Sequence, residues 1–165
     1  MSNLHYYTRP TERHDQTLQC DLCIYGGNSG GIAAAVAARR LGLEVVVLEP
    51  GRHLGGMSAG GLSFTDIGNK RAIGGVAREF YRRVGAHYGV KEHWCFEPKV
   101  AKRVFLDWVR EAGIKVFFTS FLDSVDLQNN RITRLRTENG IEVSARMFMD
   151  CSYEGDLMAA AKVSF

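Results

Sequence analysis

The chain has 165 residues, of which 45% are apolar and 24% are charged, and its formal net charge is +3 with neutral histidines. This composition is typical of a globular domain and excludes a disordered or fibrous chain. No apolar run is long enough to span a bilayer, and the first twenty residues contain no apolar segment like that of a secretory signal. The four scattered cysteines favour a reduced, cytoplasmic protein. The small positive charge neither demands nor excludes a nucleic-acid partner, and we expect neither a nucleic-acid nor a membrane partner.

The chain is expected to form one domain over residues 21–165, preceded by an irregular lead-in over residues 1–20. No repeat, low-complexity tract or linker divides it. A helix starts near Leu157, and only a few residues follow it. We therefore expect the front part of a larger protein, without its substrate domain.

The first half of the domain predicts a βαβ unit. Residues 21–25 form a buried strand that stops at a glycine run, and Ile32 to Leu41 is an Ala-rich helix. Residues 44–48 form a second strand that is apolar without alternation. Continuous apolar strands are typical of parallel sheets covered on both faces.

Further elements follow in chain order after a second glycine-rich stretch over residues 50–75. They are helices over 76–86 and 98–112, a strand over 114–118, strands over 121–127, 131–137 and 141–145, and a short strand over 147–149. The Asn139-Gly140 pair is a strong hairpin signal, so the three middle strands predict a small antiparallel meander. The fold class is therefore α/β: a Rossmann-like dinucleotide-binding domain with a parallel sheet and an inserted antiparallel β-meander.

The glycine run after the first strand has the residue types of a dinucleotide site. Gly26 suits the tight turn, and Gly31 suits close packing of the helix on the strand. Asn28 stands where the usual fingerprint has its second glycine, and asparagine tolerates left-handed backbone better than most residues. Glu49 directly follows the second strand, where a carboxylate can accept hydrogen bonds from ribose hydroxyls.

A second glycine loop distinguishes between cofactors. Residues 52–57 read Arg-His-Leu-Gly-Gly-Met, just after the acidic residue. Backbone amides of Gly55 and Gly56 can line the same pyrophosphate, which a long, extended cofactor such as FAD needs and a simple nicotinamide dehydrogenase does not.

With these features the chain resembles the FAD-dependent oxidoreductases of the glutathione-reductase-like superfamily. More narrowly, it is similar to the branch that includes heterodisulfide-reductase-A-like proteins. The segments that carry the resemblance are Tyr25 to Gly31, Glu49-Pro50, His53 to Met57, Ile73 to Gly75, Phe96 to Pro98 and Asp150 to Leu157.

The resemblance implies a set of FAD-binding residues in the two glycine loops. Those around the pyrophosphate would be Gly26, Gly27, Asn28, Ser29, Gly30 and Gly31. Glu49, with Pro50 beside it, would hold the adenosine ribose. Those along the diphosphate and ribityl chain would be Arg52, Gly55, Gly56 and Met57, and those near the flavin ring would be Ser58, Gly60 and Gly61.

Three further positions complete this set. Leu122 matches the position that meets the adenine through its backbone. Cys151 and Ser152 stand where related flavoproteins carry an Ala-Thr-Gly turn, with Tyr153 in place of the glycine. Asp156 is a further, weaker candidate for a cofactor contact. The resemblance implies hydride transfer through FAD to or from a small-molecule substrate, and it assigns no catalytic acid or base.

Two alternatives remain open: a fragment of an NAD(P)-binding dehydrogenase, and a non-catalytic module with an empty dinucleotide fold. Cys20 and Cys23 have a CxxC spacing, but residues three apart in a strand face opposite sides, so we expect no metal site. The chain as given is also expected to self-associate through the surface near its C-terminal end.

Overall fold

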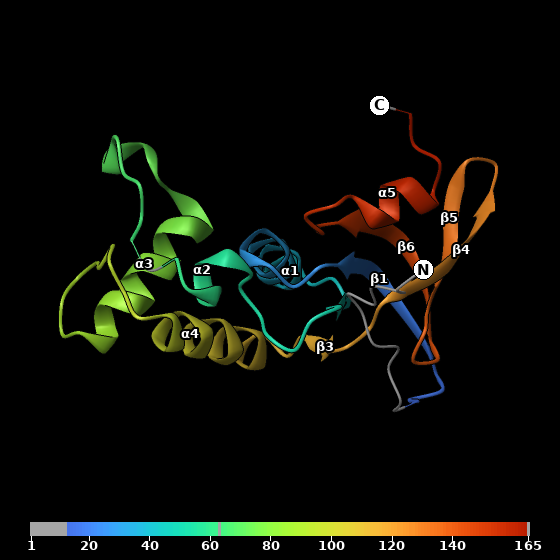
Figure 1. The fold of residues 1–165 in the computed structure, drawn as a ribbon, viewed down its shortest axis with the longest axis horizontal. Coiled ribbons are helices and arrows are strands. Elements are labelled where there is room, and N and C mark those ends of the chain that lie inside the picture. Colours follow the sequence, from blue (N-terminus) through green and yellow to red (C-terminus); the bar gives the residue numbers. More distant parts are fainter. Residues whose placement is uncertain (1–12, 63, 165) are drawn as a thin grey trace, which may run out of the picture.

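The computed structural model describes residues 13–62 and 64–164. The elements are β1 (Gln16–Tyr25), α1 (Ser29–Arg40), β2 (Val45–Leu48), α2 (Met57–Gly60), the 3₁₀ turn η1 (Lys70–Ala72), α3 (Gly75–His87), α4 (Pro98–Glu111), β3 (Lys115–Phe117), β4 (Leu122–Gln128), β5 (Arg131–Thr137), β6 (Ile141–Asp150) and α5 (Asp156–Ala160). Figure 1 shows helices α2, α3 and α4 on the left, α1 at the middle and the sheet on the right, where the β4–β5 ribbon and α5 also lie.

The sheet has six strands in the order β3-β2-β1-β6-β5-β4. The first four are mutually parallel, and β5 and β4 extend the sheet antiparallel to them. The expected α/β class with an inserted meander is therefore confirmed. The expected break between residues 141–145 and 147–149 is wrong, because β6 is one strand that pairs antiparallel with β5 near Val143 and parallel with β1 as far as Asp150.

The first strand is longer than the sequence pattern indicates. β1 begins at Gln16, so residues 16–20 are not irregular, and only residues 13–15 of the described lead-in precede the strand. These five residues pair with the start of β6, from Gln16 beside Ile141 to Cys20 beside Ala145. Their side chains are largely exposed, which hides the strand from a search for buried apolar runs. Residues 1–12 lie outside the described part of the chain.

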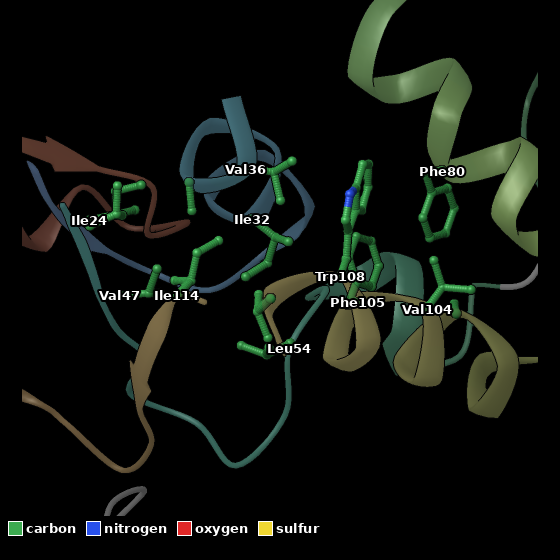
Figure 2. Close-up of a cluster of buried hydrophobic side chains, with 14 of the residues drawn as sticks. Ile24, Ile32, Val36, Val47, Leu54, Phe80, Val104, Phe105, Trp108 and Ile114 are labelled. Atoms are coloured by element: carbon green, nitrogen blue, oxygen red, sulfur yellow. The ribbon is translucent and has the colours of Figure 1, made fainter. Parts of the chain in front are cut away.

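The larger part of the core lies between the sheet and the helical layer. Figure 2 shows Ile24 and Val47 of the sheet facing Ile32 and Val36 of α1, with the side chains of α4 beyond them. Helix α4 begins with Pro98 in its first turn, as predicted, and buries Val104, Phe105 and Trp108 on one face. The Phe105 ring stacks on that of Phe80 from α3, with 4.7 Å between ring centroids. A smaller cluster fills the opposite face of the sheet.

The two hairpins of the meander turn at asparagine and glycine residues. Asn129 and Asn130 both adopt positive φ, +49° and +60°, as a two-residue turn with the right twist requires. At the second turn Gly140 has φ +89°. The buried Asn139 side chain donates to the Thr119 carbonyl, which connects this turn to the loop before β4.

Cys20 and Cys23 do not face opposite sides of the sheet as expected. Both are buried in the smaller core cluster. The N–H groups of Asp21 and Leu22 both donate to the Glu44 carbonyl, an irregularity like that of a β-bulge, and it changes the alternation of the side chains. Burial raises the pKa of the Cys20 thiol to about 11 and also raises the pKa of the Cys23 thiol, so both are neutral thiols in the core.

Candidate cofactor site at the carboxyl ends of the strands

Three turns meet where β1, β2 and β6 end. Because these strands are parallel, their carboxyl ends lie at the same edge of the sheet, which is where ligands bind in open α/β folds. Backbone hydrogen bonds connect the turns: the Gly26 N–H donates to the Leu48 carbonyl at 2.8 Å, and the Cys151 N–H donates to the Tyr25 carbonyl at 2.7 Å. A cavity of about 350 Å³ opens between them.

The first turn depends on two glycines that allow close backbone approach. Gly26 has φ +104°, and a Cβ there would lie 2.6 Å from the carbonyl oxygen of Cys151. A Cβ on Gly31 would overlap the Gly26 carbonyl oxygen. The roles expected for both glycines, a tight turn and close packing of the helix, therefore agree with the geometry.

Asn28 acts as the cap of α1 and does not adopt left-handed backbone. Its φ is −69° and its ψ is −177°, so the expected reason for an asparagine at this position is wrong. The side-chain oxygen accepts a hydrogen bond from the Gly31 N–H at 2.9 Å, and the side-chain amide donates to the Cys151 carbonyl. A glycine at this position could make neither bond, so Asn28 holds the first and third turns together.

The N-terminus of α1 lies beside the site, because its cap Asn28 lines the cavity. Ser29 and Gly30, its first two residues, are exposed. First-turn N–H groups have no acceptor within their own helix, and Asn28 caps only that of Gly31. The positive end of the helix dipole and these amides together favour an anion such as a pyrophosphate.

Glu49 joins the first and second turns through its carboxylate. The Gly27 N–H donates to Oε2 at 2.5 Å, and the Gly51 N–H donates to Oε1 at 2.6 Å. Each oxygen retains capacity for a second hydrogen bond, and Glu49 lines the cavity. This placement is compatible with the expected contact to two ribose hydroxyls.

The second glycine loop packs against α4 and against the third turn. Gly55 and Gly56 have φ +94° and +51°, and a Cβ on Gly55 would overlap the Phe105 ring. A Cβ on Gly56 would overlap the hydroxyl of Tyr153. The Met57 N–H donates to that hydroxyl at 2.9 Å.

The third turn is fixed by its own side chains. Oδ1 of Asp150 accepts hydrogen bonds from the Ser152 N–H and hydroxyl, at 2.8 and 2.7 Å. Ser152 Oγ in turn accepts from the N–H groups of Gly155 and Asp156. Burial, with the charge of Asp150 as a second cause, raises the pKa of the Cys151 thiol. Cys151 is therefore a packing thiol at neutral pH and a poor nucleophile.

The carboxylates around the cavity have no cationic counterpart among the lysine and arginine side chains. Glu49, Glu154 and Asp156 line it, together with His53, and no lysine or arginine is among the lining residues. Burial raises the pKa of Asp156, and the charges of Glu154 and Asp150 raise it further. A phosphate group would therefore depend on backbone amides and on the α1 dipole rather than on cationic side chains.

The structure brings many of the predicted site residues to this cavity. Those that line it are Gly26, Asn28, Glu49, Pro50, Gly56, Cys151 and Ser152. Ser58 instead lines a neighbouring cavity of about 260 Å³, together with Ser29 and Gly30. Arg52, Gly60 and Gly61 are exposed and line neither cavity.

Leu122 lies at a third cavity, and its backbone N–H already has an acceptor. That N–H donates to the hydroxyl of the buried Tyr25 at 3.0 Å. Sequence reasoning assigned no role to Phe121, Tyr153 and Glu154, which line the first cavity. Of these three residues, only Tyr153 had a signal in the sequence, namely its position inside the turn motif after Ser152.

The cavity and the three turns around it fit an extended dinucleotide. The glycines allow backbone to approach a ligand, the α1 N-terminus supplies donors, and Glu49 supplies acceptors. Within residues 13–62 and 64–164, no group of three or more His, Cys, Asp or Glu side chains is placed to hold a metal ion. No helix in this part of the chain is long and apolar enough to cross a membrane.

Comparison with known proteins agrees with this geometry. The family model described as FAD dependent oxidoreductase matches residues 21–165. No curated protein matches the chain.

Solved structures share the fold at low sequence identity. L-proline dehydrogenase from P. horikoshii has 14% identity and a TM-score of 0.65 over 90% of this chain and 57% of its own. L-amino acid deaminase from Proteus vulgaris has 14% identity and a TM-score of 0.60, covering 86% and 49%. The myxobacterial FAD-dependent halogenase CndH has 16% identity and a TM-score of 0.60, covering 82% and 37%. The chain thus spans about half the length of such proteins or less.

Proposed function

This chain belongs to the FAD dependent oxidoreductase family, and we propose that it holds FAD across the three turns at the carboxyl ends of β1, β2 and β6. Family membership confirms an FAD-dependent oxidoreductase domain, with FAD as its cofactor. The observation that carries the proposed site is the convergence of Asn28, Glu49 and Gly56 on one cavity, with the first residues of α1 at the cavity beside it.

Different residues would bind different parts of the cofactor, each according to its chemistry. The Glu49 carboxylate would hold the adenosine ribose, because it has free acceptor capacity at the cavity. The N–H groups of the exposed residues Ser29 and Gly30 would bind the diphosphate at the helix N-terminus. Ser58, at the neighbouring cavity lined by Phe80 and Phe105, lies on the side where the flavin ring would continue.

The bound flavin would supply hydride transfer to or from a small-molecule substrate, and the protein would bind it, orient it and exclude water from it. We assign the chain to the heterodisulfide-reductase-A-like branch of the glutathione-reductase-like superfamily and to the cytoplasm. The four cysteines, all free, support a reducing compartment. Arg52, Gly60, Gly61 and Leu122 stay predicted contacts.

The test is FAD binding by the purified chain and by Glu49→Gln. FAD should bind to the wild-type chain and give a flavin absorption spectrum, and NAD⁺ should not displace it. Glu49→Gln should weaken binding about 10- to 100-fold, because a hydrogen bond to a charged acceptor contributes about 1.5–3 kcal/mol. Titration of flavin fluorescence measures the dissociation constants.

Glu44→Gln is the matched control. Glu44 precedes β2 at the opposite end of the strand, where its carboxylate pairs with Arg39 at 2.7 Å. This variant should bind FAD as the wild type does. A folded wild-type chain that binds no FAD, or a Glu49→Gln chain that binds it equally well, would contradict the proposed site.

A further inference from the structure

Tyr153 connects the third turn to the second glycine loop through its hydroxyl. That hydroxyl accepts a hydrogen bond from the Met57 N–H at 2.9 Å and occupies the space that the absent side chain of Gly56 leaves open. Both Gly56 and Tyr153 line the candidate cofactor cavity. Met57 is one of the residues expected along the diphosphate and ribityl chain, where its N–H would be a backbone donor. In this structure the protein's own phenol uses that donor.

The backbone that carries Tyr153 is held independently of this contact. Ser152 and Asp150 fix the turn through hydrogen bonds to the N–H groups of Ser152, Gly155 and Asp156. The Tyr153 residue itself is 58% exposed. Rotation of the side chain can therefore release the hydroxyl from Met57 while the turn keeps its shape.

A single N–H group makes one strong hydrogen bond at a time. A cofactor oxygen that reached the Met57 amide would need the position of the Tyr153 hydroxyl. The space beside Gly56 also holds only one group, because even a methyl group there would overlap the Tyr153 phenol. The Tyr153 hydroxyl and a cofactor oxygen therefore cannot both occupy the position beside the Met57 N–H.

We propose that Tyr153 competes with the cofactor for the Met57 N–H, so that its hydroxyl holds the place of a cofactor oxygen and must rotate away when FAD binds. This inference rests on the proposed FAD site and adds to it a residue that sets the affinity. Tyr153 then weakens FAD binding by the net strength of one hydrogen bond, and it covers the second glycine loop while the site is free.

The experiment compares Tyr153→Phe with the wild type, using FAD itself as the ligand. The variant keeps the ring and removes the hydroxyl, so FAD should bind about 2- to 12-fold more tightly, the ratio that corresponds to one net hydrogen bond. Flavin fluorescence gives the dissociation constants. Without FAD, the Met57 amide should exchange its hydrogen faster in the variant, which NMR can measure.

Tyr88→Phe is the matched control. The Tyr88 hydroxyl also accepts a backbone N–H, that of Glu97 at 3.0 Å, but Tyr88 does not line the cavity. Its removal should leave FAD affinity unchanged. If Tyr153→Phe binds FAD equally or more weakly, or if Met57 exchange is unaltered, the inference is overturned while the proposed function stands. If neither the wild type nor Tyr153→Phe binds FAD, the proposed function fails and the inference fails with it.

Discussion

Gly31 determines how closely α1 approaches the first turn. A Cβ at this position would overlap the Gly26 carbonyl oxygen, and it would lie 3.3 Å from the Cβ of Cys151. We expect Gly31→Ala to displace the start of α1 and to lower the free energy of unfolding by about 1–3 kcal/mol, the usual cost of overpacking. Urea denaturation followed by circular dichroism measures this change.

Gly60→Ala provides the comparison for that prediction. Gly60 lies in the short helix α2, and a Cβ there would have no atom within 4 Å. This variant should be neutral or slightly stabilising, because alanine restricts the unfolded chain more than glycine does. Equal midpoints for Gly31→Ala and the wild type would show that α1 tolerates a side chain at this point.

The role of Gly31 is local and could be predicted from the sequence, because it follows from the place of this glycine in the turn after a strand. The ribose contact of Glu49 stays a prediction. The role of Asn28 could not be predicted, because its side-chain amide donates to Cys151, 123 residues later in the chain. Tyr153 was similarly hidden, since its partner Met57 comes from a different turn. Contacts between distant turns depend on tertiary packing, and a local pattern does not encode them.

At the scale of elements, Glu92 braces α3 against the loop that follows it. The Glu92 carboxylate accepts hydrogen bonds from Arg78 at 2.7 Å and from Arg82 at 3.2 Å, and only 13% of its side chain is exposed. The hydrogen bond from Arg78 is the largest cause that lowers the pKa of Glu92. A carboxylate with a lowered folded pKa stabilises the fold above its unfolded pKa and loses this effect as pH falls through the folded value.

We therefore expect Glu92→Gln to melt at a lower temperature than the wild type at pH 7. The gap should close as the pH falls below the ordinary range of a glutamate, about 4.3, because the wild-type carboxylate then becomes protonated as well. Melting curves at several pH values test this. Glu111→Gln is the control: Glu111 pairs with Arg83 at 2.7 Å but is 54% exposed, so its loss should matter little at any pH. A gap that stays constant with pH would exclude the ion pair as its cause.

The elements with a clear periodicity were predicted well, and their ends less well. Helix α4 and both hairpins follow from Pro98, from the apolar face of the helix and from the turn residues. The first five residues of β1 could not be predicted in this way, because most of their side chains are exposed and pairing with β6 holds them in place. The continuity of β6 was missed for a related reason, since its pairing with β1 continues through polar residues between its apolar ones. Backbone pairing leaves no signature in side-chain composition, so a polar strand reads as a loop.

At the scale of the whole molecule, β6 is the strand that joins the parallel sheet to the meander. It pairs with β1 along its whole length, and in its second half Met147 lies beside Leu22 and Met149 beside Ile24. Leu22 and Ile24 are buried in the cluster that α1 covers, whereas Met147 is 64% and Met149 36% exposed. Figure 1 shows α1 lying over the side of β1 that is away from the meander. The helical layer thus leaves the methionines of β6 uncovered.

We expect this 165-residue chain to self-associate through the exposed β6 methionines, so its average mass should rise with concentration. Burial of one methionine side chain contributes about 1.5–3 kcal/mol, so Met147→Lys should weaken the association at least about tenfold. Light scattering over a concentration series measures both. Leu41→Lys is the control, because Leu41 is 79% exposed at the end of α1, away from β6. Monomers at every concentration would contradict the prediction, and equal effects of the two lysines would place the association elsewhere.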